Sequence, residues 1–218
     1  MARPDWRRTL IGVAVAALLL AVTTVAATAV LSVRVTGSSM RPALHDGDRV
    51  VVDPFADRPR RFDLVAARFA ESGPLAVKRV IGLPGDRVRI AVRLPGAGAA
   101  AGPDPGPDAG AGAGPDVGAD TAAPAVLVRP GGVGPWQRVH NPAWQDQWRR
   151  LAPMDETVVP DGSLFLLGDN PDGSEDSRQL GVAPQRLVHG TVRLRVYPLS
   201  ALGRPSGGAS LQPFQADG

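Results

Sequence analysis

Three short segments carry side chains that could act as a nucleophile, a base and an orienting group. Residues 36–44 (TGSSMRPAL) place Ser39 in a glycine-containing turn, where a hydroxyl can be exposed and backbone N–H groups left free. Residues 77–86 (VKRVIGLPGD) hold Lys78 inside an apparent strand. Residues 167–178 (LGDNPDGSEDSR) are dense in turn formers, acids and hydroxyls. Taken singly, the first segment is far more often an ordinary polar turn, and the third also fits a solvated loop.

Lys78 is the only lysine in the chain, so 23 of the 24 basic residues are arginine. Arginine keeps its proton in a protein, whereas burial can lower the pKa of a lysine until the amine is neutral. A serine hydroxyl is a weak nucleophile without a base, and a neutral lysine can supply one. The pattern therefore favours nucleophilic chemistry by a serine–lysine pair, with a chance surface lysine as the competing interpretation.

The composition excludes several other classes of function. The chain has no cysteine, which excludes disulfides, Cys-ligated zinc, iron–sulfur clusters and thiol catalysis. His45, His140 and His189 are too scattered for a metal-binding spacing, so we expect neither a metal nor a cofactor. The net charge is only +3 and the arginines are spread along the chain, so we expect no nucleic-acid partner.

Residues 9–33 form an uncharged run rich in Ala, Val and Leu, directly after Arg7 and Arg8. A helix of this length crosses a hydrocarbon core of about 30 Å. We predict a single transmembrane anchor, with residues 1–8 in the cytoplasm and the rest of the chain on the outer side of the cell membrane. The alternative is a cleavable signal peptide, since residues 27–29 read Ala-Thr-Ala, but the apolar run is longer than a usual signal sequence.

The part after the anchor is predicted to be mostly β. Short segments rich in Val, Ile, Leu and Phe, separated by Gly, Pro or Asp, indicate strands. They fall at residues 49–53, 64–69, 76–81, 87–94, 163–167 and 190–197. No long helical pattern lies between them, which disfavours a parallel βαβ sheet and favours an antiparallel domain.

The middle of the chain differs in composition. In residues 95–125, 25 of 31 positions are Ala, Gly or Pro, and we predict a disordered insertion. Residues 126–157 contain three tryptophans, of which Trp144 and Trp148 share one helical face with Leu151. This spacing predicts a short helix packed on the sheet; the alternative is a membrane-interface foot. Residues 204–218, rich in Gly, Pro and Ser, are predicted to be a flexible tail.

The three segments, in this order and after an apolar run, resemble the motifs of type I signal peptidases, the membrane-bound Ser-Lys proteases. Residues 37–44 match the G-x-S-M-x-P-x-L block, and residues 78–86 match the lysine block almost letter for letter. Residues 168–181 match the G-D-N-x-x-x-S-x-D-S-R-x-x-G block. The resemblance implies an antiparallel β catalytic core in two parts, residues 34–94 and 158–203, with a variable region between them.

The resemblance also implies roles for individual residues. Ser39 would be the nucleophile and Lys78 the general base, with Ser174 orienting the Lys78 amine. Asp176 and Arg178 would brace the active-site loop.

Two further roles concern the first block and its departures from the family pattern. Met40 would lie beside the substrate cleft, and the Ser39 backbone N–H would be one oxyanion donor. Gly37 stands where some members carry an assisting serine, as in Gram-positive-type members, so the second donor is open, with Ser38 as one option. Pro171 replaces an arginine often found after G-D-N.

The implied function is that of a membrane-anchored serine endopeptidase. It would remove signal peptides from exported preproteins by cutting after small residues in an A-x-A pattern, with preproteins and the lipid bilayer as partners. One alternative is a specialised Ser-Lys processing peptidase with a narrow substrate. Another is an inactive membrane-anchored binding module. An autocleaving DNA-binding repressor is disfavoured by the apolar run.

Overall fold

The computed structural model describes residues 6–56, 58–91, 124–144, 148, 151–205 and 208–214. The predicted disordered insertion, residues 95–125, lies outside them except for its last two positions. Of these, Ala125 already begins a strand.

Seven strands form the first sheet, and every pairing in it is antiparallel. In sheet order they are β1 (Ser32–Arg34), β2 (Arg49–Asp53), β11 (Val188–Tyr197), β3 (Leu64–Ala67), β4 (Ala76–Gly82), β9 (Ser163–Leu167) and β10 (Ala183–Pro184). Strands far apart in the chain are thus neighbours, since β4 pairs with β9. This pairing brings the lysine-bearing segment beside the start of the third motif.

Five strands form the second sheet, again antiparallel. In order they are β12 (Ser210–Pro213), β7 (Gln137–His140), β6 (Ala125–Arg129), β5 (Arg87–Ala91) and β8 (Met154–Val158). The prediction of a mostly β, antiparallel fold is confirmed. The prediction of a flexible tail over residues 204–218 is wrong for β12, because residues 210–213 pair with β7 and gain its hydrogen bonds.

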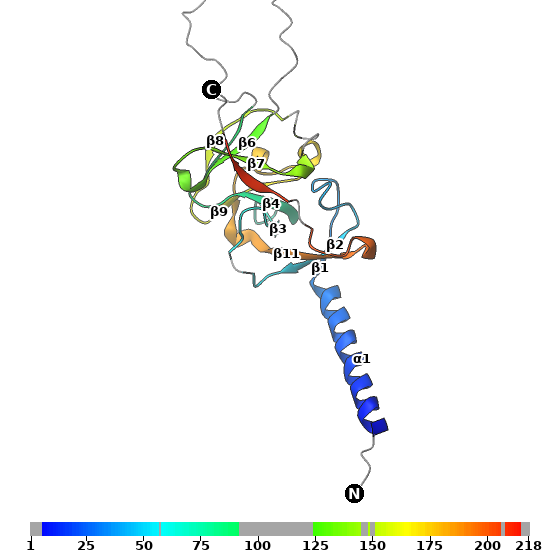
Figure 1. The fold of residues 1–218 in the computed structure, drawn as a ribbon. Coiled ribbons are helices and arrows are strands. Elements are labelled where there is room, and N and C mark those ends of the chain that lie inside the picture. The colour runs from blue at the N-terminus through cyan, green and yellow to red at the C-terminus, as the bar shows by residue number, and fades with distance from the viewer. Residues whose placement is uncertain are drawn as a thin grey trace, which may run out of the picture.

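A shared apolar core joins the two sheets. Ile81 and Phe165 of the first sheet pack with Val88 and Val128 of the second, all of them fully buried. Gly82 lets the sheets pack closely, because a Cβ there would lie 2.9 Å from the Val88 side chain of the second sheet and 2.8 Å from the Cβ of Phe165 on the neighbouring strand. The second sheet lies beyond the first as seen from the N-terminal helix (Figure 1). The two sheets therefore form one body around the lysine-bearing strand.

The helices are few. α1 (Trp6–Leu31) is the long one, and it projects away from the sheets (Figure 1). The others that the structure bounds within its described residues are α2 (Ser177–Leu180) and the 3-10 turns η1 (Pro130–Gly132), η2 (Pro142–Trp144), η4 (Pro171–Gly173), η5 (Gln185–Leu187) and η6 (Leu199–Ala201). α1 ends at Leu31, two residues before the end of the predicted apolar run at residue 33. Within the described residues, no helix has both the length and the hydropathy that a bilayer span requires, so the predicted anchor is not shown.

The tryptophan-rich region is also arranged differently from the prediction. Where it is described, the expected short helix is 3-10 in form: the Trp144 N–H of η2 donates to the Asn141 carbonyl at 2.9 Å, and Trp148 also has 3-10 conformation. Trp144 and Trp148 stack with their ring centroids 4.0 Å apart, and each is only 5% exposed. Leu151 joins the same core. Because both indoles are buried, the alternative of a membrane-interface foot does not hold for them.

Candidate active site

Strand β4 fixes Lys78 by its register between two neighbours. Lys78 lies opposite Val65 of β3, while the next residue, Arg79, lies opposite Leu167 of β9. Successive residues of a strand point to opposite faces, so Lys78 and Arg79 serve different sides of the sheet. Lys78 is only 4% exposed, and its Nζ donates a hydrogen bond to Ser174 Oγ at 2.9 Å.

Burial lowers the pKa of the Lys78 amine below its ordinary value, because removal from water penalises the charged form. Among the charges near Lys78, the Asp176 carboxylate is the largest influence and raises the pKa. Arg178 lowers it, and Glu175 raises it slightly. Desolvation outweighs them, so the net direction favours a neutral amine.

Ser174 links the amine to a buried carboxylate. Its hydroxyl accepts from Lys78 and donates to Asp176 Oδ2 at 2.8 Å. Asp176 is fully buried, and the same oxygen accepts the Gly168 N–H at 2.9 Å. A neutral amine has two N–H groups and one lone pair. With one N–H given to Ser174, the lone pair is left to accept a proton from another group.

Arg178 braces the loop that carries Ser174. Its guanidinium binds both carboxylate oxygens of Asp176, at 2.8 and 3.0 Å, and donates to the carbonyls of Pro171 and Ser174. Asp176 also caps α2, since its side chain accepts the Arg178 backbone N–H while Gln179 closes the capping box. One acid thus orders both the turn before it and the helix after it.

Ser39 contacts the same loop through its backbone. Its carbonyl accepts the Asn170 N–H at 3.0 Å, and the Asn170 side chain donates to the Ser38 carbonyl. A Cβ on Gly168 would lie 2.2 Å from Ser174 Oγ and 2.6 Å from the Ser39 carbonyl oxygen. Gly168 therefore sits between the two serines, and the structure brings the three predicted segments together.

No hydrogen bond within the described residues joins the Ser39 hydroxyl to the Lys78 amine. Such contacts are often long in a substrate-free site and tighten when substrate binds.

The backbone amides of Gly37 and Ser39 are the candidate oxyanion donors of this turn. The Gly37 N–H already has a hydrogen-bond partner, because it donates to Asp46 Oδ1 at 2.8 Å. The Ser39 N–H has no such partner in the described part of the chain. Of these two amides, only that of Ser39 is free to meet an oxyanion.

Met40, which is predicted to lie beside the substrate cleft, directly follows Ser39 and has a buried side chain. Its side chain is 1% exposed and packs in the core cluster with Leu44, Val50 and Leu64. Its observed contacts are those of a core residue that anchors the turn after Ser39.

Arg79 and Asp169 form a buried ion pair that was not predicted from the sequence. The guanidinium binds both oxygens of the carboxylate, at 2.7 and 2.6 Å, and donates to the Phe62 carbonyl. Trp144 Nε1 donates to the same carboxylate at 3.1 Å. A buried pair needs such additional hydrogen bonds to offset its desolvation. The signal in the sequence was a charge next to Lys78 in an otherwise apolar strand.

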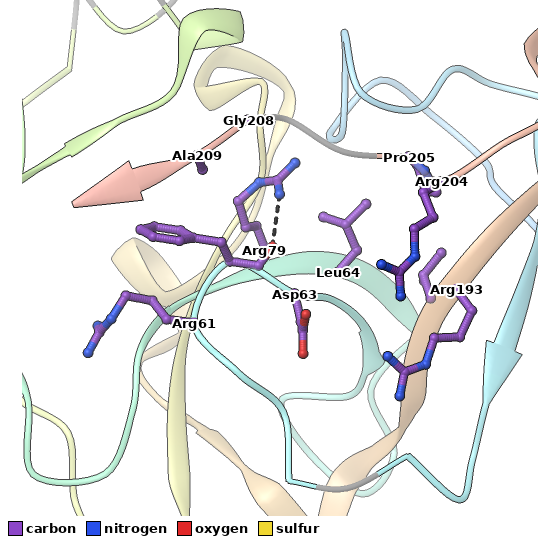
Figure 2. A pocket seen from close by; sticks show the side chains of 11 residues that line it. Arg61, Asp63, Leu64, Arg79, Arg193, Arg204, Pro205, Gly208 and Ala209 are labelled. Atoms are coloured by element: carbon purple, nitrogen blue, oxygen red, sulfur yellow. Dashed lines mark hydrogen bonds between the residues drawn. The ribbon is translucent and has the colours of Figure 1, made fainter.

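A pocket of about 330 Å³ lies on the Arg79 side of β4, and neither Ser39 nor Lys78 lines it. Figure 2 shows four arginines around it, namely Arg61, Arg79, Arg193 and Arg204. Three of them are already paired, with Asp86, Asp169 and Asp53 respectively. Asp63 adds a further carboxylate to the lining. The local charge is thus largely balanced, so the arginines alone do not make this pocket an anion site.

Comparison with known proteins points to one family. Residues 6–197 match the family model described as "Signal peptidase, peptidase S26". The chain is 29% identical over 173 residues to signal peptidase I of Bacillus licheniformis, covering 77% of each chain. It is 49% identical over 47 residues to mitochondrial inner membrane protease subunit 1 of Xenopus tropicalis, covering 22% of this chain and 28% of that protein. A crystal structure of a signal peptidase I from Enterococcus faecalis matches with a TM-score of 0.40 and 22% identity, covering 62% of this chain and 97% of that one.

The tight packing around Gly168 generates a first prediction. A methyl group added there would overlap Ser174 and the Ser39 carbonyl, so Gly168→Ala should lower the free energy of unfolding by about 1–3 kcal/mol. The matched control is Gly73→Ala, whose methyl would meet only the Ala70 backbone, with a closest approach of 3.2 Å. Urea unfolding of both variants in detergent measures the difference. Equal midpoints would show that Ser39 and Ser174 do not crowd Gly168.

Proposed function

Because the chain belongs to the peptidase S26 family of signal peptidases, we propose that it removes signal peptides from exported preproteins with Ser39 as nucleophile and Lys78 as base. The similarity to signal peptidases I supports an enzyme of this type. One observation carries the choice of residues. The only lysine of the chain is buried, is hydrogen-bonded to Ser174 and has a lowered pKa, on a strand whose Val77 shares a core cluster with Met40, the residue after Ser39.

In this mechanism the Ser39 hydroxyl attacks the carbonyl carbon of the scissile peptide bond. Lys78 accepts the hydroxyl proton as the bond forms, and the Ser39 N–H donates to the developing oxyanion. Lys78 then gives the proton to the leaving amine as the peptide bond breaks. Water, deprotonated by the same amine, hydrolyses the Ser39 ester and regenerates both groups.

The neighbouring polar groups maintain this proton transfer. Ser174 holds the Lys78 amine by one N–H, which directs the remaining lone pair. Asp176 fixes Ser174 and is itself fixed by Arg178. The preference for small residues in an A-x-A pattern rests on the resemblance of the motifs.

We also propose that the enzyme works at the outer face of the cell membrane, anchored by residues 9–33. The supporting observations are the uncharged run and the preceding Arg7 and Arg8. The catalytic core would comprise residues 34–94 and 158–203, with residues 95–157 as an inserted region.

Cleavage of a model preprotein tests the proposed function. Full-length chain in liposomes should cut after the small residue of an A-x-A site. Ser39→Ala and Lys78→Arg should each lose roughly a thousandfold or more, because the first lacks the nucleophile and the second stays protonated. Phe55→Ala, at a residue 93% exposed, is the matched control and should remain active. Cleavage of one substrate in a panel would instead indicate a narrow-substrate peptidase. No cleavage by folded wild type would indicate an inactive binding module.

The pKa of Lys78 sets the expected pH dependence. Only the deprotonated amine accepts a proton, so the cleavage rate should rise with pH, with a midpoint below the usual lysine value of about 10.4. Asp176→Asn removes a negative charge that stabilises the ammonium form. Its residual activity should therefore have a lower midpoint than wild type. A wild-type midpoint at the usual lysine value, or an upward shift in the variant, would contradict the assignment.

The absence of cysteine makes the proposed topology easy to test. Single cysteines replacing Asp5 or Phe55 can be labelled in intact cells with a membrane-impermeant maleimide. Cysteine at position 55 should react before lysis, and cysteine at position 5 only after it. The reverse pattern, or labelling of both before lysis, would rule out the proposed orientation.

A further inference from the structure

Trp148 of the inserted region meets the peptide group that holds the nucleophile. Its Nε1 donates a hydrogen bond to the Asp169 carbonyl at 3.2 Å, and the Asn170 N–H donates to the Ser39 carbonyl at 3.0 Å. The Asp169 carbonyl and the Asn170 N–H belong to one planar peptide group. An indole on one edge of that plane and Ser39 on the other are therefore joined by two hydrogen bonds.

Trp148 is itself held firmly. It is 5% exposed and stacks on Trp144 at 4.0 Å with an interplanar angle of 17°. Trp144 is tied in turn to the Asp169 carboxylate, which Arg79 binds through both oxygens. Trp148 thus binds the backbone carbonyl of Asp169, and Trp144 binds its side-chain carboxylate. Together they leave the Asp169–Asn170 peptide group little freedom to rotate.

The same ring also reaches the base side of the site. The Arg178 guanidinium lies over Trp148, 5.7 Å from the ring centroid. Arg178 holds Asp176, which holds Ser174, which accepts from Lys78. One side chain of the inserted region therefore contacts the supports of both the nucleophile and the base.

We propose that Trp148 is a positioning residue, which sets the place of Ser39 relative to Lys78 through the Asp169–Asn170 peptide. This inference rests on the proposed Ser39–Lys78 mechanism. The Asn170 N–H restrains the carbonyl oxygen of Ser39. The direction of that carbonyl group fixes the Ser39 backbone, and the backbone in turn sets where the side-chain hydroxyl lies. Displacement of a reacting group by about 1 Å can cost a hundredfold in rate, so a modest loosening of this peptide is enough to slow catalysis.

A purely structural role for the tryptophans makes a different prediction. A buried indole N–H needs a hydrogen-bond partner in any case, and stacked rings contribute to stability wherever they lie. Losing either would then lower the fraction of folded protein. It would not lower the turnover of the molecules that remain folded, nor affect the Asn170 amide more than its neighbours.

The test compares Trp148→Phe with Trp136→Phe in the full-length chain. Trp136 is the matched control, because it belongs to the same region but packs under Arg89 and Arg129. For Trp148→Phe we expect kcat per folded molecule to fall about tenfold or more, with KM within about twofold. The control should stay within about twofold of wild type. Hydrogen exchange at the Asn170 amide should speed up only in the Trp148 variant.

A second variant guards against misfolding of the first. Site-specific replacement of Trp148 by 3-benzothienylalanine keeps the bicyclic ring and its stacking but removes the donor. The same loss of kcat and faster Asn170 exchange would support the proposal. The proposal would be overturned if this variant left both Asn170 amide exchange and kcat unchanged. It would also be overturned if activity fell only in proportion to the fraction of folded protein. If wild type cleaves no preprotein, the proposed function fails, and the exchange measurement alone then decides whether Trp148 restrains the Ser39 support.

Discussion

The structure depends on keeping one amine out of water while leaving it a single well-placed partner. Lys78 is buried in the first sheet and donates to Ser174, so desolvation lowers its pKa while the hydrogen bond fixes its direction. Either condition alone would be insufficient, since an exposed lysine stays charged and an unanchored one has no fixed lone pair. The nearby Asp176 opposes the shift, and its pairing with Arg178 limits how far it does so.

The rest of the fold can be understood as support for that environment. The two faces of β4 carry different functional side chains, Lys78 on one face and Arg79 on the other. Arg79 holds Asp169 next to the end of β9, and this fixes the loop that continues to Ser174. The second sheet, together with Trp144, Trp148 and Leu151 between β7 and β8, completes the apolar core beside this pair. The inserted region is therefore joined to the catalytic core by polar contacts as well as by packing.

The sequence was sufficient for features that depend on local pattern. Alternating apolar residues predicted the antiparallel strands, whereas the pairing of Lys78 with Ser174 was predicted from the resemblance of the three motifs to those of signal peptidases. Features that depend on distant contacts were missed. Residues 210–213 of the tail form β12 because they pair with the edge of β7. The position of Trp148 is set by its hydrogen bond to the Asp169 carbonyl and not by helical spacing. Met40 was assigned from resemblance alone, and its burial reflects the packing of the turn.

Direct titration of the Lys78 amine measures whether burial lowers its pKa. Because the chain has one lysine, full-length protein labelled with 13Cε-lysine gives one resonance to follow by NMR as the pH is raised. We expect a midpoint below the ordinary lysine value of about 10.4, in Ser39→Ala as well as in wild type. A midpoint at or above that value in the folded protein would contradict it, because the amine would then be charged where it has to accept a proton.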